Sequence, residues 1–462
     1  MSDSDNDSLN TEDYLDENDF LDESSNESLD SELESESESE LKSKTYKYID
    51  LCHGIGGFRV AFDMLQLKNK NIKFECVLSA DIKEDAIKTY NLNFNEKNKK
   101  LDICDIKIKE MPNFNILCAG FCCQPFSSAG LKKGLSDDRG QIIFQILNIC
   151  RVKNPEYVIL ENVPNLLLME DGAIMKQISN EFIKLGYKVS YKIFNSKDFN
   201  VPQNRERIFI MCTKLKKIDL NKVKISVGKK LLKDVIETNQ KYTDIETVFA
   251  KKIIDLHKTK PLYGYKMQDK RGGENNIHSW DIGVGTSTGI SVEEKELISK
   301  IMTERRKKKW AELKKIVWMD GMPLTEKEIF SFYPNKNLKK MLNNLVEKNY
   351  LKLEKPKDLV NNKRIYKIDA EEGYNICKGK LSFPISNILD PNDISPTLTA
   401  TDSSKLVVII DDKYLRKLTI NELKLICGFP LNFKIPDGVN AYDLFGNMAI
   451  PMVIYAILDI IF

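Results

Sequence analysis

Two adjacent cysteines, Cys122 and Cys123, are the residues best suited to covalent chemistry. The apolar run 116–119 predicts a short buried strand, and Gly120 marks its end. The residues that follow are rich in Pro, Ser and Gly, which places the cysteines on a loop at the carboxyl end of a strand, where ligands collect in open α/β sheets. A thiol there is a nucleophile if a helix N-terminus or a cation lowers its pKa. The alternative is a thiol that only packs, because Cys is among the most buried residue types.

Glu161 is a second residue with suitable chemistry. The apolar run 157–160 predicts a buried strand that ends at Glu161. If this strand runs parallel to the first, Glu161 and Cys123 lie at the same edge of the sheet. A partly desolvated carboxyl group keeps its proton near neutral pH and can serve as a proton donor. The alternative is a Glu that only caps a helix.

Three side chains with several donors, Gln203, Arg205 and Arg207, lead into a predicted strand over 208–212. Side chains of an extended segment alternate between two sides, so these three point to one side. Such a row suits recognition of phosphates and base edges. A solvated surface row has the same pattern, and the residues alone leave both interpretations open.

A glycine-rich turn indicates where a cofactor could bind. Gly54, Gly56 and Gly57 follow a predicted strand and open a predicted helix. Glycines let the backbone approach a ligand closely, and the helix directs N–H groups towards it. Asp81 ends the next predicted strand, where an acidic residue is well placed to bind ribose hydroxyls. The glycine pattern alone is also that of a structural turn.

Alternating strands and helices position these candidates. Strands are predicted over 48–51, 75–79, 116–119, 157–160 and 208–212, and helices over 58–67, 85–93 and 141–151. This alternation implies an α/β fold with a doubly wound, mostly parallel sheet. The block 406–462 returns to the same character, with a strand over 406–410 and a helix over 419–427.

Charge is segregated along the 462 residues. Residues 1–41 hold 17 Asp or Glu and no Lys or Arg, and their low apolar content predicts a disordered tail. The remaining chain holds 70 Lys and Arg against 51 Asp and Glu, which suits a polyanionic partner.

Cysteine content and hydropathy bear on the compartment. Ten cysteines without a signal peptide favour free thiols and an intracellular protein, cytoplasmic or nuclear and not secreted. The apolar segment 444–462 contains Asn447, Pro451 and Asp459, so we expect a buried core helix there and no membrane span.

The middle of the chain is rich in Lys and Asn. The basic run 305–310 is either a DNA-contacting helix or a solvated face. Thr325 is a predicted helix N-cap, and apolar residues recur at helical spacing from Leu338 to Leu345, before a predicted strand near 350–353. This order predicts a winged helix-turn-helix over 320–368, which either binds DNA or only spaces other parts.

Taken together, these segments resemble the cytosine-5 DNA methyltransferases, most closely those of bacterial restriction-modification systems. The matching blocks occur in order at residues 50–58, 119–127, 161–163, 203–207, 416–430 and 446–447, and residues 395–400 are also similar. The resemblance implies the Rossmann-like fold of methyltransferases that use S-adenosylmethionine. It covers 46–214 and about 390–462 closely, and the middle only by position.

The resemblance also implies the roles of the four parts. Residues 1–44 form the acidic tail, and residues 45–214 the catalytic domain that binds S-adenosylmethionine. Residues 215–405 form a target recognition domain, and residues 406–462 complete the catalytic domain.

The chemistry implied by the resemblance starts with Cys123, which attacks C6 of a cytosine flipped out of duplex DNA. C5 then accepts the methyl group of S-adenosylmethionine, leaving S-adenosylhomocysteine, and loss of the C5 proton releases Cys123. Glu161 protonates or hydrogen-bonds N3. Arg207, alone or together with Arg205, binds the base near O2. Asn162 helps to shape the pocket.

The remaining implied roles concern cofactor and DNA. The cofactor residues are Asp50, Gly54, Ile55, Gly56, Gly57, Asp81, Asp102 and Asn447, with Asp105 as the alternative to Asp102 for the adenine amino group. The DNA contacts are Gln124, Ser127, Gln203, Thr397 and Thr399.

Four positions depart from the usual family pattern. Cys122 replaces a Pro before the nucleophile, Cys52 an aromatic residue, His53 a small residue and Asp81 a Glu. None of these changes removes a required functional group, so we expect an active enzyme.

Other classes of protein fit these residues less well. A transfer RNA cytosine-5 methyltransferase lacks so long an insert, and a catalytically silent DNA-binding relative would not need Cys123, Glu161 and Arg207. A nicotinamide-dependent enzyme leaves the cysteine loop unexplained. We expect no metal, because the cysteine spacing is not a zinc pattern. The expected partners are double-stranded DNA and, as a candidate, a cognate restriction endonuclease; the chain is expected to be a monomer.

Overall fold

The computed structural model describes residues 44–121, 141–226, 228–267, 275–278, 281–282, 290–317, 321–360, 363–377 and 383–462. The expected acidic tail up to residue 43 and the loop that carries Cys122 and Cys123 lie outside these residues. What the sequence predicts for them stays a prediction.

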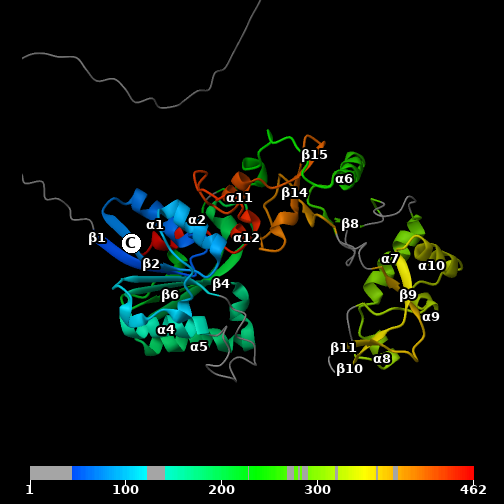
Figure 1. Cartoon of the computed structure of the whole chain (residues 1–462), viewed down its shortest axis with the longest axis horizontal. Coiled ribbons are helices and arrows are strands. Elements are labelled where there is room, and N and C mark those ends of the chain that lie inside the picture. The colour runs from blue at the N-terminus through cyan, green and yellow to red at the C-terminus, as the bar shows by residue number, and fades with distance from the viewer. Residues whose placement is uncertain are drawn as a thin grey trace, which may run out of the picture. The chain divides into compact units, whose positions relative to one another are not determined.

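A six-stranded sheet forms the centre of the N-terminal half, in the order β2-β1-β3-β4-β6-β5 (Figure 1). Its strands are β1 (Lys44–Leu51), β2 (Ile72–Ala80), β3 (Ile116–Gly120), β4 (Tyr157–Asn162), β5 (Lys188–Asn195) and β6 (Glu206–Thr213). Strands β1 to β4 run parallel, and β6 is antiparallel to both of its neighbours. The predicted doubly wound, mostly parallel sheet is confirmed.

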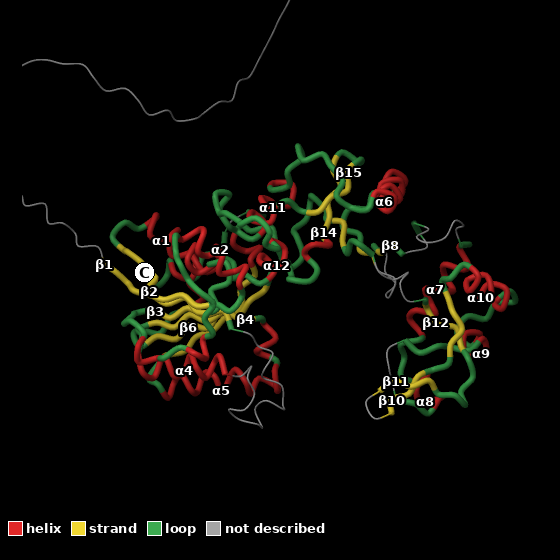
Figure 2. Tube along the Cα trace, viewed as in Figure 1, coloured by secondary structure: helices red, strands yellow, loops and turns green. Residues whose placement is uncertain are grey.

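Helices cover both faces of this sheet because its central strands are apolar on both sides. In β3, Ile116 and Cys118 join the core beneath α1, while Leu117 and Ala119 join the core beneath α4 and α5. Figure 2 shows helices on either side of the yellow strands. The helices are α1 (Gly57–Lys68), α2 (Glu84–Phe94), α4 (Gln141–Lys153) and α5 (Ala173–Lys184).

The C-terminal block packs against the N-terminal half. Lys68 pairs with Asp459 at 2.6 Å, and the rings of Tyr46 and Phe462 lie 4.7 Å apart. Its helices are α11 (Ile420–Ile426), α12 (Ala441–Gly446) and α13 (Pro451–Leu458). The apolar residues of α12 and α13 belong to the core on one face of the central sheet. These helices therefore complete that face.

A second, five-stranded sheet has the order β15-β14-β13-β7-β8, with α6 (Thr247–Thr259) packed against it. The strands are β7 (Lys266–Met267), β8 (Asn276–Ile277), β13 (Asn387–Ile388), β14 (Leu406–Ile410) and β15 (Tyr414–Lys417). This sheet runs across the expected domain boundary at residues 405 and 406, because β14 pairs with β13.

Ala441–Leu458 is apolar and long enough to be compared with a membrane span. Pro451 begins a new helix, so α12 and α13 are separate short helices rather than one. Their side chains, among them Phe445 and Ile454, are buried in the protein core. The expected core location of this segment agrees with the structure.

Residues 290–377 contain a segment with a hydrophobic core of its own. Its helices are α7 (Val292–Glu304), α8 (Lys309–Lys314), α9 (Glu326–Phe330) and α10 (Leu338–Glu347), and its strands are β9 (Leu351–Glu354), β10 (Lys357–Val360), β11 (Lys363–Tyr366) and β12 (Gly373–Ile376).

Candidate active site

The predicted catalytic residues that the structure describes meet at the carboxyl edge of the central sheet. Gly120 and Glu161 are paired in the parallel register of β3 and β4, and the Phe121 N–H donates to the Glu161 carbonyl at 3.3 Å. A Cβ atom on Gly120 would stand 3.6 Å from Oε2 of Glu161. The Glu161 carboxyl group therefore lies over the point where the chain leaves β3 towards Cys123.

Glu161 forms a shielded ion pair with Arg207. Oε1 of Glu161 lies 3.0 Å from Nε of Arg207, and the two side chains are only 12% and 15% exposed. They meet because β6 begins at the edge where β4 ends. Burial raises the pKa of Glu161 above its usual value, against the opposing effect of the Arg207 and Arg205 cations. Glu161 can therefore keep a proton at a higher pH than an exposed Glu.

Asn162 holds the start of the cysteine loop. Its Nδ2 donates to the Phe121 carbonyl at 2.9 Å, and its Oδ1 accepts from the Val163 N–H at 2.8 Å. The side chain is buried, so both bonds are shielded from water. Asn162 thus fixes the backbone one residue before Cys122.

The predicted nucleophile Cys123, its neighbour Cys122, and the predicted DNA contacts Gln124 and Ser127 lie outside the described residues. The eight described cysteines are all free thiols. Burial raises the pKa of Cys52, Cys150 and Cys427 to about 12. Burial also raises the pKa of Cys118 well above its usual value. These four thiols stay protonated at neutral pH, which makes them poor nucleophiles.

Gln203 and Arg205 are buried in the protein. Nε2 of Gln203 donates to the Ile426 carbonyl at 3.0 Å, and its Oε1 accepts from the Leu398 N–H at 3.2 Å. The Arg205 guanidinium donates to the Leu398 and Met448 carbonyls at 2.8 Å and to the Gly446 carbonyl at 3.3 Å. Through these hydrogen bonds, both side chains hold the segments near 398 and 446 against the start of β6.

The predicted DNA-contacting threonines lie on the segment that Arg205 holds. Oγ1 of Thr397 donates to the Asn204 carbonyl at 2.6 Å. Thr399 is exposed, and its Oγ1 accepts from the Asp402 N–H at 3.2 Å. This segment passes so close to α12 that a Cβ atom on Gly446 would stand 2.3 Å from the Ala400 nitrogen.

The glycine turn combines close packing with open space. A Cβ atom on Gly57 would stand 2.2 Å from the Ala449 carbonyl oxygen, and one on Gly56 would stand 2.4 Å from the Phe94 ring. Gly54 has a positive φ of 53°, and no atom lies within 4 Å of its Cβ position. Only Gly54 of the three therefore leaves room for a ligand, while Ile55 is buried in the core.

Two acidic residues border the glycine turn. Asp81 accepts from the Gly54 N–H at 2.8 Å and from the Lys83 N–H at 2.8 Å. Asp102 accepts from the Cys104 N–H at 2.8 Å and caps a short helical turn. Both carboxylates are partly exposed and keep acceptor capacity for a ligand. Asp105, the alternative to Asp102, is exposed.

Asn447 connects to the same edge through α12. Its Nδ2 donates to the Asp443 side chain at 2.9 Å, and Asp443 forms an ion pair with Lys83. Lys83 follows Asp81 by two residues. Lys83 and Asp443 thus link Asn447, at the predicted amino-acid end of the cofactor site, to Asp81, at its predicted ribose end. The sequence did not predict this link.

Asp50 and His53 lie beneath the turn. Asp50 is fully buried, and burial raises its pKa to about 8, against the opposing effect of the Arg59 cation. The rings of His53 and Tyr90 lie with their centroids 4.0 Å apart at a tilt of 38°, and burial lowers the pKa of His53. In this structure His53 is therefore a packing residue.

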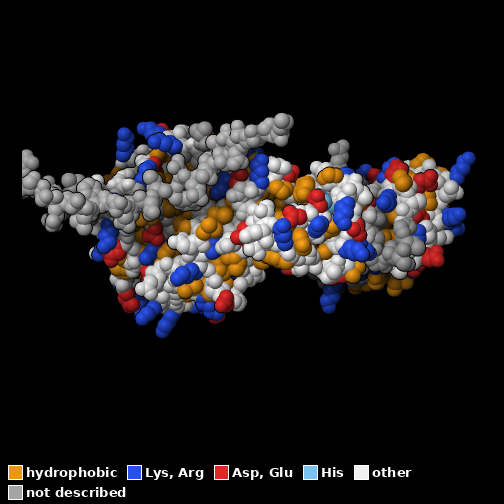
Figure 3. Space-filling model, turned by 90° about the horizontal axis from the view of Figure 1, so that it is seen from above, with side chains coloured by type: hydrophobic (Ala, Val, Ile, Leu, Met, Phe, Trp, Pro, Cys, Tyr) orange, Lys and Arg blue, Asp and Glu red, His pale blue; other side chains and the backbone are white. Residues whose placement is uncertain are grey.

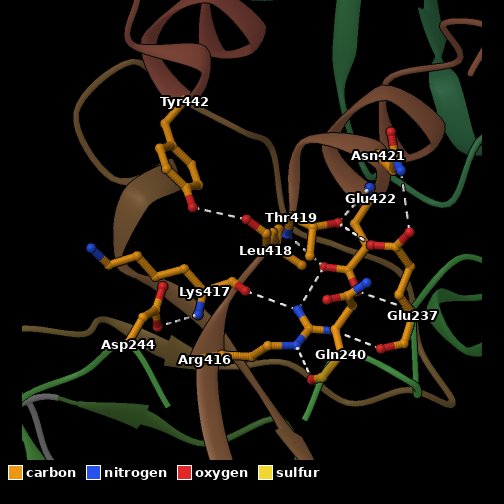
Figure 4. A network of polar contacts seen from close by, with 10 residues as sticks. All are labelled: Glu237, Gln240, Asp244, Arg416, Lys417, Leu418, Thr419, Asn421, Glu422 and Tyr442. Atoms are coloured by element: carbon orange, nitrogen blue, oxygen red, sulfur yellow. Dashed lines mark hydrogen bonds and ion pairs between the residues drawn. The ribbon is translucent and has the colours of Figure 1, made fainter. Parts of the chain in front are cut away.

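A buried polar network surrounds Arg416 (Figure 4). Arg416 and Glu422 have no exposed side-chain surface, and their closest atoms lie 2.7 Å apart. Arg416 also donates to the Glu237 and Gln240 carbonyls at 2.9 and 3.0 Å. Thr419 and Glu422 form a capping box at the start of α11, and Glu422 also accepts from the Glu237 N–H at 2.8 Å.

Within the described part of the chain, no group of three or more His, Cys, Asp or Glu side chains could hold a metal ion. The expectation that the protein binds no metal stays a prediction.

The fold and the residues at the sheet edge define the class of protein. The structure of S. pombe Dnmt2 methyltransferase is similar, with a TM-score of 0.50 over 90% of this chain and 98% of that chain, at 17% identity. The chain therefore has the α/β fold of this class of methyltransferases.

Sequence comparisons give the family. A model of the C-5 cytosine-specific DNA methylases matches residues 46–462. The type II methyltransferase M.NlaIV of Neisseria lactamica is 39% identical over 417 residues, which are 88% of this chain and 96% of that protein. M.BanI of Aneurinibacillus aneurinilyticus is 33% identical over 90% of this chain and 95% of that protein. The chain belongs to the C-5 cytosine-specific DNA methylases and is a DNA (cytosine-5-)-methyltransferase of the type II restriction-modification kind.

Proposed function

We propose that the enzyme methylates C5 of a cytosine flipped out of duplex DNA, through a covalent bond between Cys123 and C6. The observation that carries this proposal is the Glu161–Arg207 pair beside Gly120, at the root of the Cys123 loop. C6 of cytosine is a poor electrophile, so attack needs a thiolate together with a proton donor at N3. A target atom inside a duplex also requires the base to be flipped.

The chain's own residues divide this chemistry. The Cys123 sulfur bonds to C6 while Glu161 donates or shares a proton at N3, which removes the negative charge that develops on the ring. Arg207 lies beside Glu161 and, in this proposal, binds O2 of the base. Once C5 is methylated, its proton passes to a base such as water, the C5–C6 double bond forms again, and the Cys123 sulfur leaves as a thiolate.

Gln203 and Arg205 act as positioning residues in this proposal. Both side chains are buried and already donate to protein carbonyls. We therefore propose that they support the segments at 398 and 446–448, and that Gln203 does not contact DNA and Arg205 does not contact the base. Asn162 has the same kind of role at Phe121. Thr397 and Thr399 stay candidate DNA contacts, as do Gln124 and Ser127.

The residues around the glycine turn fit S-adenosylmethionine, which the family implies. Bound there, this cofactor supplies an activated methyl group on a sulfonium. The open space at Gly54 and the remaining acceptor capacity of Asp81 and Asp102 suit its nucleoside part. Asn447 is proposed to hold the amino-acid end, and Asp50 to support the turn from below.

We also propose the wider setting. Residues 215–405 act as the target recognition domain, and residues 406–462 complete the catalytic domain. The protein works inside the cell as a monomer, and a restriction endonuclease of the same specificity is its candidate partner. The relatives named above are type II methyltransferases, which supports this setting.

A trapping experiment tests the mechanism. Duplex DNA with 5-fluorocytosine at the target lacks the removable C5 proton, so the enzyme and S-adenosylmethionine should form a complex that survives denaturation. Peptide mapping should place the bond at Cys123, and Cys122→Ser should still form the complex. A bond at Cys122, or none with active enzyme, would overturn the proposal.

A further inference from the structure

The segment from α7 to β12 has the connectivity of a winged helix. After α7 and α8, Leu324 forms a bridge with Tyr374 of β12, and β12 pairs antiparallel with β9. Helices α9 and α10 lie between Leu324 and β9 in the chain, and the hairpin of β10 and β11 lies between β9 and β12. Figure 2 shows these elements as one group. Helices, a bridging residue, two short strands and a hairpin follow one another as in the winged helix-turn-helix that the sequence predicts over 320–368, but β12 lies beyond that range.

Helix α10 occupies the place of a recognition helix. One side of it, formed by Leu338, Met341, Leu342 and Leu345, is buried in the core of the segment. The opposite side carries Lys339, Lys340 and Asn343, which are exposed, and Lys336 is exposed just before the helix. Its first two turns thus present cations and an amide outward, as a helix that enters a DNA groove requires.

The hairpin of β10 and β11 adds a second basic surface. All four residues of β11 are exposed, among them Lys363, Arg364 and Tyr366. The Lys357 ammonium lies 4.4 Å from the centre of the Tyr366 ring, which orders the base of the hairpin. Residues 335–367 hold ten Lys or Arg against three Asp or Glu.

The cations on α10 and the hairpin differ from those elsewhere in the segment. Within the described residues, Lys336, Lys339, Lys340, Lys363 and Arg364 form no ion pair or side-chain hydrogen bond. By contrast, Lys307 and Lys309 pair with Glu304, and Lys314 pairs with Glu328. Figure 3 shows acidic side chains interspersed among the basic ones on the face it presents. The cations of α10 and the hairpin therefore differ from the others by their lack of a described partner, and not by how many there are.

The basic run 305–310 is less suited to contact DNA. Lys307 and Lys309 both pair with Glu304, and Trp310 is buried in the core of the segment. Between the two surfaces that the sequence suggested, the structure favours α10 and the hairpin.

We propose that the segment 290–377 is a second DNA-binding module, which places α10 in the major groove and the hairpin along the backbone of the same duplex. The proposal rests on the proposed function, because the duplex is the one that carries the target cytosine. Five cations on α10, just before it and on the hairpin have no partner among the described residues, and they match the phosphates of a duplex. Helix α10 exposes no large apolar side chain, so a protein partner fits its outer side less well.

The test uses the full-length enzyme and a matched control. One variant carries Lys339→Gln, Lys340→Gln and Arg364→Gln, which removes three unpaired cations. The control carries Lys295→Gln, Lys300→Gln and Lys307→Gln, which removes three cations of the same module that pair with carboxylates. Both variants lose three charges. All six side chains are at least partly exposed, so we expect both variants to fold. Thermal unfolding checks this.

For the first variant, we expect Kd for duplex DNA to rise on the order of tenfold at physiological salt, and kcat at saturating DNA to be unchanged. The slope of log Kd against log salt should become shallower by about 2.7, since each phosphate contact contributes about 0.9. Hydroxyl-radical footprints should lose one protected stretch. The control should keep the wild-type slope and footprint.

Other outcomes separate the two proposals. An equal loss in both variants, or wild-type behaviour of the first variant, would overturn the second module while methyl transfer by the wild type continues. If the first variant instead changes only the binding of a peptide of residues 1–41, the surface binds the acidic tail and the proposal is wrong. A wild-type enzyme that transfers no methyl group to DNA would refute the proposed function.

Discussion

Oε1 of Glu161 lies 3.0 Å from Nε of Arg207, at the edge where β4 ends and β6 begins. This pair couples a carboxyl group whose burial favours the protonated form to a cation that favours the ionised form. The balance leaves the pKa of Glu161 above its usual value. Both groups therefore have a part in setting the pH range in which Glu161 can donate a proton.

The first prediction concerns the pH dependence of this pair. Because Glu161 must be protonated, single-turnover methylation should decline as pH rises through its raised pKa. Glu161→Gln should lower the rate about 10²- to 10⁴-fold and remove this decline. Arg207→Met removes the cation that opposes protonation, so its residual activity should decline at a higher pH than the wild type. A decline at the same pH in both would contradict the assignment.

The second prediction separates Arg205 from Arg207. Arg205→Ala leaves the carbonyls of Leu398, Gly446 and Met448 without their donor, so the free energy of unfolding should fall by about 3 kcal/mol or more. Arg207→Ala leaves only Glu161 without its partner, and Glu161 can take up a proton, so this variant should lower Tm less than Arg205→Ala and should lower kcat. Thermal unfolding and steady-state kinetics on both variants decide this. An Arg205→Ala enzyme with wild-type Tm and lost kcat would show a catalytic rather than a positioning role.

The third prediction concerns Asp50, whose pKa is raised by burial to about 8. Between pH 4 and 8 the folded state holds a proton on Asp50 that the unfolded chain releases, so the free energy of unfolding falls as pH rises through this range. Asp50→Asn has no proton to release at this position, so its free energy of unfolding does not fall in this way. The difference in Tm between the variant and the wild type should therefore grow in favour of the variant from pH 5 to pH 8. A constant difference would contradict burial of a protonated Asp50.

The fourth prediction compares two glycines of the cofactor turn. Gly57→Ala places a Cβ atom against the Ala449 carbonyl, so unfolding should become easier by about 1–3 kcal/mol. Gly54→Ala meets no protein atom and pays only for its positive φ, about 1–2 kcal/mol. Calorimetric titration with S-adenosylmethionine should nevertheless show weaker binding by the folded Gly54→Ala enzyme. Unchanged binding would mean that the space at Gly54 is not used by the cofactor.

Much of the central sheet could be predicted from sequence because its strands are short apolar runs bounded by Gly, Asp or Glu. The helix expected over 58–67 is α1, Gly57–Lys68, and the strand expected over 157–160 is β4, Tyr157–Asn162. Helix α5 and strand β5 were not predicted, and β5 lacks a continuous apolar run because Lys192 interrupts it.

The sequence predicts which residue types form the site, but it does not predict most of the contacts that these residues make. Period two places Gln203, Arg205 and Arg207 on one side, but only the fold shows that the first two are buried against residues about 200 positions later. The link from Lys83 to Asp443 and the hold of Arg416 on residues 237–240 are likewise long-range. Local patterns contain no information on such pairs.

Transfer of labelled methyl from S-adenosylmethionine tests the central claim most directly. Unmethylated duplex DNA and transfer RNA are offered side by side to the wild type, Cys123→Ser and Cys122→Ser, and the label is located by nucleoside analysis. We predict label at C5 of cytosine in DNA with the wild type and Cys122→Ser, and none with Cys123→Ser. Label in transfer RNA alone, or DNA binding without label, would contradict the account.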